Sequence, residues 1–257
     1  MKTALITGAS SGIGLELAKI HASKGGNLVV VARNKSKLED LKSELEKKFQ
    51  IHVTVITKDL SLPNSPKEVF EETERLGLKI DYLINNAGFG LFGEFEHTDW
   101  IEEKNMIQVN ITALTEFTKL YLPGMIAGKE GKILNVASTA GFVPGPMMAV
   151  YFSTKHYVLC FSESINNEVQ KHGVSVTALC PGATESGFSI AAKAESSALF
   201  TKTKLATSLD VAEFGYNAML NNKQVAIHGF LNKLLTFVVR LSPRSLVVKI
   251  TRKVIDK

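Results

Sequence analysis

Apolar and polar positions follow one another along the chain in two different rhythms. Several short runs are almost continuously apolar, which is typical of parallel strands covered on both faces. These runs are TALIT (3–7), NLVVVA (27–32), IHVTVIT (51–57), DYLIN (81–85), GKILNVA (131–137), VSVTALC (174–180) and QVAIH (224–228). Between them lie longer segments with helical periodicity, such as SKLEDLKSELEKKF at 36–49. The pattern predicts an α/β fold with a doubly wound parallel sheet of about seven strands and helices on both faces.

Length and composition limit the number of domains and the classes of partner that we expect. The 257 residues are 45% hydrophobic, and no linker or repeat divides them, so we expect one domain over 1–257. The net charge of +5 suits an anionic cofactor, a membrane surface or a nucleic acid. Without zinc-finger spacing or a compact basic cluster, we expect no nucleic-acid partner and no metal.

The cysteines and the start of the chain bear on location. Cys160 and Cys180 lie in apolar contexts, which favours two buried free thiols in a reducing compartment. The first residues, MKTALITG, enter the first predicted strand at once. No apolar run reaches the ~18 residues of a membrane-spanning helix. We therefore expect a cytoplasmic protein.

The residues that follow the strands are the places to look for function, because ligands of such sheets bind outside the carboxyl ends of the strands. Six segments should meet at this edge. They are Gly8–Gly14, Arg33–Asn34, Asp59–Leu60, Asn86–Gly88, Ser138 and Pro181–Gly182.

The first of these segments is a glycine-rich loop between a strand and a helix that begins near Ile13. This geometry aims backbone N–H groups and the helix dipole at an anion. Gly8 would allow a tight turn, Gly12 a close approach to a pyrophosphate, and Gly14 close helix packing. The spacing G-x-x-x-G-x-G differs from the usual dinucleotide fingerprint, and a turn without a ligand stays an alternative. The residues expected to contact a cofactor here are Gly8, Ser10, Ser11, Gly12, Ile13 and Gly14.

The end of the second predicted strand bears on the choice of cofactor. An acidic residue about 20 positions after the loop would bind a ribose 2′-hydroxyl. The sequence VVVARNKSK instead offers Arg33, with Lys35 and Lys37 behind it. A guanidinium suits a ribose 2′-phosphate, so NADP(H) is favoured over NAD(H). The alternative is a solvated basic start of a helix.

Tyr151 and Lys155 stand four residues apart in YFSTK, so they share a face if the segment is helical. A phenol has a reference pKa of about 10, and a close ammonium group lowers that value. Tyr151 would then exchange a proton near neutral pH. Ser138 ends the strand GKILNVAS, and its hydroxyl can donate to the same substrate oxygen as Tyr151.

Together these motifs resemble the short-chain dehydrogenase/reductase family in its form of about 250 residues. The matching pieces run in the family's order from residue 3 to about 190. They are Thr-Gly-x-x-x-Gly-x-Gly at 7–14, DL at 59–60, NNAG at 85–88, VN at 109–110, Ser138, YFSTK at 151–155 and PG at 181–182. The resemblance implies a Rossmann-type fold and hydride transfer between NADP(H) and a ketone, an aldehyde or a secondary alcohol.

The resemblance also implies a role for single residues. Asp59 and Leu60 would hold the adenine, and Asn86, Ala87 and Gly88 would line the adenosine side. Pro181, Gly182 and Thr184 would shape the nicotinamide pocket. Ser138 and Tyr151 would bind the carbonyl oxygen, Tyr151 would give the proton, and Lys155 would also bind the nicotinamide ribose. Asn110 would hold a water linked to Lys155, or else be a hydrogen-bonded structural asparagine.

The segment at about 183–209 shows no clear strand pattern and is long enough for a substrate lid. Its apolar side chains favour an apolar or acyl-type substrate, although they would also suit simple packing of the lid. A non-catalytic NADP(H)-binding regulatory or scaffold protein is the alternative function. A sugar-nucleotide epimerase would need a different glycine spacing and a larger carboxyl-terminal domain. Family resemblance further implies a homodimer or homotetramer.

The tail, about 230–257, is basic and amphipathic. From 214 onwards a single acidic residue, Asp256, stands against eight lysines and arginines. Pro243 should end or kink a first helix. Such a tail can lie on anionic lipid as a peripheral membrane contact. Alternatively, its apolar face packs on the body or on a partner subunit.

Overall fold

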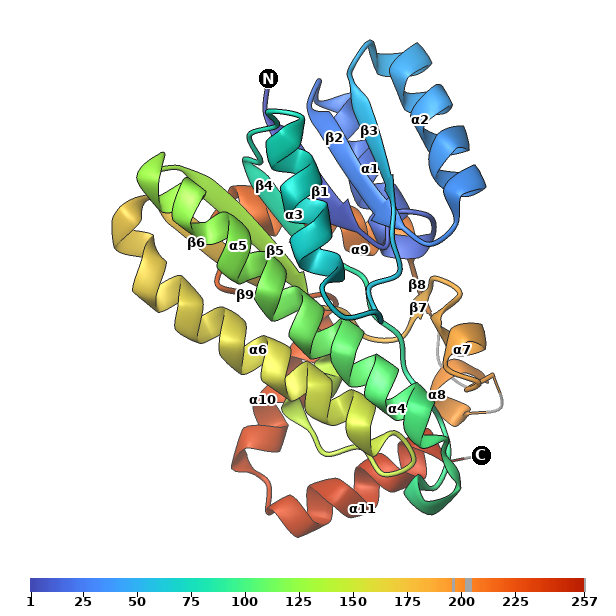
Figure 1. Cartoon of the computed structure of the whole chain (residues 1–257). Coiled ribbons are helices and arrows are strands. Elements are labelled where there is room, and N and C mark those ends of the chain that lie inside the picture. Colours follow the sequence, from blue (N-terminus) through green and yellow to red (C-terminus); the bar gives the residue numbers. More distant parts are fainter. Residues whose placement is uncertain (196, 202–204, 257) are drawn as a thin grey trace.

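Figure 1 shows a computed structural model of the protein, which describes residues 1–195, 197–201 and 205–256. Within these residues the central sheet has seven parallel strands in the order β3-β2-β1-β4-β5-β6-β9. The strands are β1 (Thr3–Thr7), β2 (Asn27–Ala32), β3 (Val53–Thr57), β4 (Tyr82–Asn85), β5 (Gly131–Val136), β6 (Val174–Cys180) and β9 (Val225–Ile227). The predicted doubly wound α/β fold is confirmed. The ladders are shorter than some apolar runs, and β3 begins two residues after the predicted 51.

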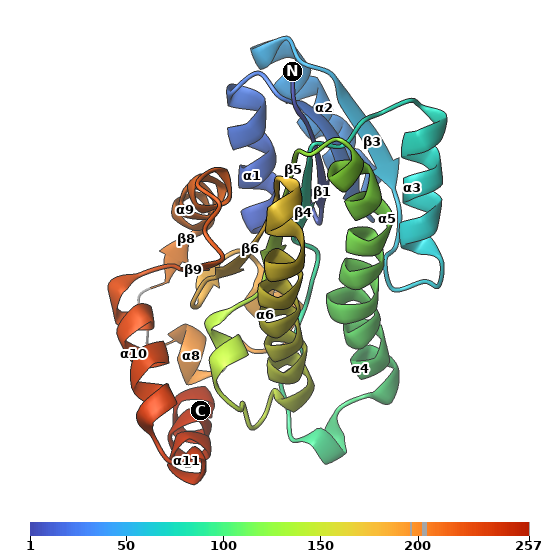
Figure 2. The same cartoon turned by 90° about the vertical axis from the view of Figure 1, so that its left-hand side faces the viewer.

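Helices cover both faces of this sheet (Figure 2). One layer consists of α1 (Gly12–Ser23), α2 (Lys35–Phe49) and α9 (Ser208–Leu220). The other consists of α3 (Ser65–Arg75), α5 (Leu114–Ala127) and α6 (Ala149–Val169). Helix α4 (Trp100–Ile107) runs into α5 through a π-helical turn, Gln108–Ala113. Because apolar side chains fill both layers, the strands are buried on both faces, as their continuous apolar runs predict.

A buried chain of polar side chains ties the middle of the sheet to the helix that carries Tyr151. The Asn85 amide donates to the Asn135 side chain at 2.9 Å, and the Asn135 amide donates to the Ser162 hydroxyl at 2.9 Å. These residues lie on β4, β5 and α6. Hydrogen bonds between buried groups need defined geometry, so this chain fixes α6 relative to the strand ends.

The segment expected to form a lid contains four short elements. They are β7 (Thr184–Glu185), α7 (Phe188–Ala191), α8 (Ala198–Thr201) and β8 (Ala206–Thr207). The strands β7 and β8 form a two-stranded ladder, which corrects the expectation of a segment without strands. Residues 196 and 202–204 of this segment, and Lys257 of the tail, lie outside the described residues.

The tail forms a helical hairpin of α10 (Phe230–Leu241) and α11 (Arg244–Ile255), with Pro243 between the helices as predicted. Most large apolar side chains of α10 are exposed, so of the arrangements considered for its apolar face, packing on the body does not occur. Cys180 is buried, but Cys160 is exposed, contrary to the expectation of two buried thiols. Among the described helices, none combines the length and hydropathy needed to span a bilayer.

Candidate active site

A cavity of about 1540 Å³ opens at the carboxyl ends of the strands. It lies next to the point where the strand order reverses, because β1 is paired with both β2 and β4. All six segments predicted to meet at this edge contribute to its wall. Of the predicted site residues, Gly14 and Asn110 are buried and do not line the cavity, and the rest line it.

The glycine loop forms one side of the cavity. Gly8 and Gly12 have φ of +68° and +55°, in the left-handed region that other residues rarely adopt. A Cβ at Gly14 would lie 2.4 Å from the carbonyl oxygen of Gly8, so this glycine lets the loop fold onto the first turn of α1. The Ser11 side chain makes no capping hydrogen bond to that helix, which leaves the first-turn N–H groups available to an anion.

Thr7 and Asn86 join the glycine loop to the end of β4. The Thr7 hydroxyl accepts hydrogen bonds from the backbone N–H groups of Asn86 and Ala87, both at 3.0 Å. The Asn86 amide donates to the carbonyl oxygens of Thr7 at 2.9 Å and Gly8 at 3.2 Å. Sequence reasoning assigned no role to Thr7. Its position at a strand end, immediately before the first glycine, was the available signal.

Arg33 and Asp59 follow β2 and β3 at the rim of the cavity. The Arg33 side chain is exposed. The Asp59 carboxylate accepts hydrogen bonds from the Ser61 N–H at 3.0 Å and the Ser61 hydroxyl at 2.8 Å. Burial opposes ionisation of Asp59, but these hydrogen bonds and the Arg33 charge hold the pKa of Asp59 below its usual value. The rim therefore presents an anion and a cation side by side.

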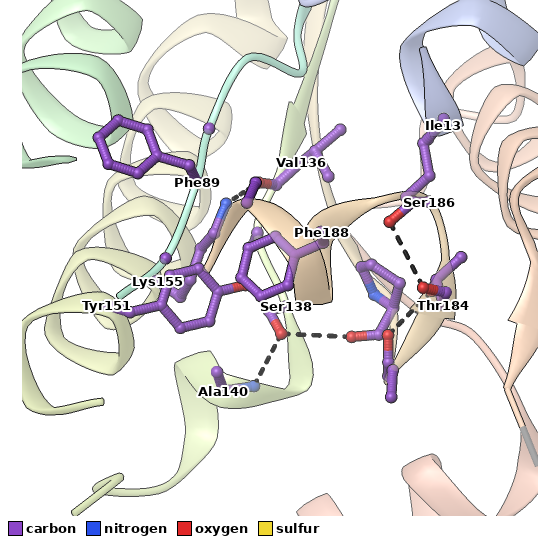
Figure 3. A pocket seen from close by; sticks show the side chains of 18 of the residues that line it. Ile13, Phe89, Val136, Ser138, Ala140, Tyr151, Lys155, Thr184, Ser186 and Phe188 are labelled. Carbon is purple, nitrogen blue, oxygen red and sulfur yellow. Dashed lines mark hydrogen bonds between the residues drawn. The ribbon is translucent and has the colours of Figure 1, made fainter. Parts of the chain in front are cut away.

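Ser138, Tyr151 and Lys155 meet at the floor of the cavity (Figure 3). Ser138 follows β5, and its hydroxyl lies 3.4 Å from the carbonyl oxygen of Pro181. Tyr151 and Lys155 project from α6 one turn apart, as the four-residue spacing predicts. The Lys155 ammonium donates to the carbonyl oxygen of Val136 at 2.7 Å, and it lies 5.8 Å from the centroid of the Tyr151 ring.

Burial sets the ionisation of these groups. Desolvation raises the pKa of Tyr151 to about 12, although the neighbouring Ser138 hydroxyl acts in the opposite direction. Desolvation also lowers the pKa of Lys155 to about 8. The pKa of Tyr151 is therefore raised, not lowered as expected, because the cost of burying a phenolate dominates. Tyr151 is a neutral O–H donor at neutral pH.

Asn110 lies in the π-helical turn between α4 and α5, a kind of distortion often found at functional sites. Its amide donates to the Phe89 carbonyl oxygen at 2.9 Å and to the Thr154 hydroxyl at 3.0 Å. Its side-chain oxygen accepts from the Phe89 N–H at 3.1 Å. Asn110 thus holds the loop after β4 against α6. These contacts agree with the alternative that Asn110 is a hydrogen-bonded structural asparagine. A Cβ on neighbouring Gly88 would lie 3.0 Å from that oxygen and 3.6 Å from the Lys155 nitrogen.

The model of the short chain dehydrogenase family matches residues 2–197. The chain belongs to this family. It is 31% identical to a very-long-chain 3-oxoacyl-CoA reductase of Macaca fascicularis over 186 residues, which cover 69% of this chain and 58% of that relative. The chain thus matches little more than half of the relative's length.

Two solved structures resemble this short-chain dehydrogenase along most of its length. One is a short-chain dehydrogenase from Sphingobium yanoikuyae in complex with NADPH, with a TM-score of 0.84, 30% identity and 94% of each chain covered. The other is a bulky-bulky ketone specific alcohol dehydrogenase from Comamonas testosteroni. Its TM-score is 0.80 at 30% identity, with 94% of this chain and 92% of that chain covered.

The segment after β6 covers the floor of this short-chain dehydrogenase's cavity. The Phe188 ring lies over Tyr151, with 5.0 Å between ring centroids (Figure 3). The ring centroid of Phe200 lies 6.2 Å from that of Phe188. Two contacts fasten this cover to the segments around α4. The Lys193 ammonium pairs with the Glu102 carboxylate at 2.8 Å, and the Phe92 N–H donates to the Ala192 carbonyl oxygen at 2.9 Å.

The tail hairpin completes the wall, which sequence reasoning did not predict. Leu231 and Leu235 of α10, and Ile250 and Val254 of α11, line the cavity. Helix α10 also touches the floor, because a Cβ at Gly182 would lie 2.7 Å from the amide nitrogen of Asn232. The only available signal was the amphipathic pattern of the tail, and that pattern does not say which body surface the helix touches.

Proposed function

We propose that this short-chain dehydrogenase/reductase uses NADPH to reduce the carbonyl group of an apolar, acyl-type molecule to a secondary alcohol. The observation that carries the proposal is the cluster of half-buried Ser138 with buried Tyr151 and Lys155 beneath an apolar cover. Similarity to a 3-oxoacyl-CoA reductase and to a bulky-ketone dehydrogenase supports the substrate class.

The residues around the cavity fit a dinucleotide phosphate cofactor. The left-handed turn at Gly8 and the free first turn of α1 suit the pyrophosphate. The exposed Arg33 guanidinium suits the 2′-phosphate, and similarity to an NADPH-bound enzyme supports that preference. Asp59, Leu60 and 86–88 would hold the adenosine. Pro181, Gly182 and Thr184, together with Lys155, would hold the nicotinamide end.

The side chains at the floor would polarise the substrate and supply its proton. When bound, NADPH supplies the hydride for the carbonyl carbon. Ser138 and Tyr151 donate hydrogen bonds to the carbonyl oxygen, and the Tyr151 proton moves to that oxygen as negative charge develops on it. The Lys155 ammonium then stabilises the phenolate until solvent restores its proton. A raised pKa suits this direction, because Tyr151 begins each cycle protonated.

The segment 183–209 would act as a substrate cover, since Phe188 packs on Tyr151 and Phe200 packs on Phe188. An apolar substrate would displace or pack against these rings. We further predict a homodimer or homotetramer, which light scattering of the purified chain would measure.

The test is NADPH oxidation with a substrate panel. The panel holds 3-oxoacyl thioesters of increasing chain length, bulky apolar ketones and polar keto sugars. We expect kcat/KM to increase with the apolar size of the substrate. A preference for the keto sugars would contradict the proposed substrate class, and NADH oxidation that is as fast as NADPH oxidation would contradict the cofactor.

A further inference from the structure

Helix α10 packs against the body of the protein through a largely polar face, although most of its residues are apolar. Its contact stripe is Asn232, Thr236 and Val239, which are buried or half-buried at helical spacing. The Asn232 amide donates to the His228 carbonyl oxygen, and the Thr236 hydroxyl donates to the Lys233 carbonyl oxygen, so the polar members of the stripe are satisfied locally. The helix therefore packs a largely polar stripe against the body, and most of its large apolar side chains lie on an exposed surface.

That other surface is apolar and continuous with the mouth of the cavity. Side chains of α10 expose large fractions of their area, such as 70% for Leu231, 58% for Phe237 and 76% for Leu241. Helix α11 adds the exposed stripe Leu246, Ile250 and Val254. Its members Ile250 and Val254 line the cavity as well. Both views place the two helices together at the end of the molecule away from α2 (Figures 1 and 2).

Cations border this apolar surface. Arg240, Arg244, Lys249 and Lys253 are exposed. Within the described part of the chain, none of these four has a carboxylate within 4.0 Å. Arg252 differs, because it pairs with Glu94 and Asp256. The hairpin thus combines unpaired positive charge with exposed apolar side chains.

We propose that the α10–α11 hairpin is a docking surface for an anionic membrane, which places the mouth of the cavity against the bilayer. Apolar side chains would enter the boundary between headgroups and acyl chains, and the bordering cations would contact anionic headgroups. A second copy of the chain fits this surface less well, because a two-fold contact would bring the two positive surfaces together. The docking itself does not depend on the proposed function. Delivery of an apolar substrate from the bilayer to the cavity would rest on the proposed function.

The experiment is co-sedimentation of the full chain with vesicles. One set consists of phosphatidylcholine alone, and the other contains phosphatidylglycerol as well. We expect binding to the anionic vesicles at low salt and weaker binding at high salt, because salt screens exposed charges. No binding to anionic vesicles at low salt would overturn the proposal, and so would equal binding to both vesicle types.

Paired variants assign the binding to the hairpin. Phe237→Asp/Leu241→Asp removes apolar side chains that do not line the cavity, and Arg240→Glu/Lys249→Glu reverses two cations. We expect each pair to weaken binding to anionic vesicles by about tenfold or more. The controls lie at the other end of the molecule. They are Leu76→Asp, which also places a charge at an exposed leucine, and Lys47→Glu/Lys48→Glu, which makes the same change in net charge.

The remaining outcomes separate the docking from folding and from catalysis. All four substituted residues of the hairpin are exposed, so the variants should keep the melting temperature of the parent. Vesicle binding needs no turnover, so an inactive protein that still binds through the hairpin would contradict only the proposed function. If light scattering instead shows a dimer that Phe237→Asp/Leu241→Asp dissociates, and vesicles are not bound, the occupant is a second copy and the membrane proposal is wrong.

Discussion

Helices α5 and α10 are both rich in large apolar side chains, and they use them in opposite ways. On α5, Phe117 is 1% exposed and packs with Tyr121 and Met125 against the sheet. On α10, Phe237 is 58% exposed, and the body contacts Asn232 and Thr236 instead. Burial of apolar area stabilises the fold in the first case only. An amphipathic pattern therefore predicts a helix with an apolar face, without saying whether that face is buried within the chain.

The largest expected effect compares one phenylalanine from each helix. Phe117→Ala should lower the free energy of unfolding by about 3–5 kcal/mol, because it leaves a cavity in the core. The matched Phe237→Ala should change it by less than about 0.5 kcal/mol, since the ring already lies in solvent. Urea denaturation of both variants and the parent measures the difference. Equal destabilisation would show that α10 is packed in solution.

A similar contrast exists within the cavity, between its buried floor and its exposed rim. Tyr151→Phe removes only the floor hydroxyl, so we expect NADPH affinity to be retained and kcat to fall by roughly 10²-fold or more. Steady-state kinetics on an accepted ketone, with NADPH binding followed by its fluorescence, measures both. Turnover equal to that of the parent would rule out Tyr151 as the proton donor.

The rim should affect the choice of cofactor and leave the chemistry unchanged. Arg33→Asp replaces a partner for the 2′-phosphate with an acceptor for a ribose hydroxyl. Loss of a charge-assisted hydrogen bond should shift the NADPH/NADH ratio of kcat/KM toward NADH by about tenfold or more. Arg75→Asp, another exposed arginine far from the cavity, is the control and should leave the ratio unchanged. If both variants keep the parent's ratio, Arg33 does not contact the phosphate.

The smallest expected effect is a pH dependence that arises at the floor. Burial lowers the pKa of Lys155 to about 8, so its ammonium form is lost as the pH rises through that value. Tyr151, with a pKa of about 12, stays protonated over the same range. The kcat/KM of carbonyl reduction should therefore decline above about pH 8, because the phenolate loses its stabilising charge. NADPH affinity measured at each pH separates this effect from loss of cofactor binding. A flat profile would contradict the assigned role of Lys155.

The sequence was sufficient for those parts of the molecule that depend on local pattern. Continuous apolar runs predicted the strands, with errors of a residue or two at their ends, as in β3. The rule that ligands bind at strand ends brought together Gly8, Arg33, Ser138 and the other lining residues. These predictions succeed because periodicity and strand order follow from backbone geometry.

What the sequence did not predict depends on contacts between distant segments. The pKa of Tyr151 rises because the residue is buried beneath Phe188, which comes 37 residues later in the chain. The hydrogen bonds of Asn110 go to Phe89 and Thr154, neither of which is near it in sequence. Cys160 has apolar neighbours, yet it lies on the outer side of α6. Local composition contains no information about these contacts.

Hydrogen bonds connect α11 to the segment that covers the floor of the cavity. The Ser197 hydroxyl donates to the Ile255 carbonyl oxygen at 2.5 Å, and the Ala198 N–H donates to the Asp256 carbonyl oxygen at 3.2 Å. Both bonds join the start of α8 to the end of α11, so the cover cannot move away from the hairpin without breaking them. Phe200 of α8 contacts Phe188, whose ring lies above Tyr151, so side-chain contacts connect the hairpin to the floor of the cavity.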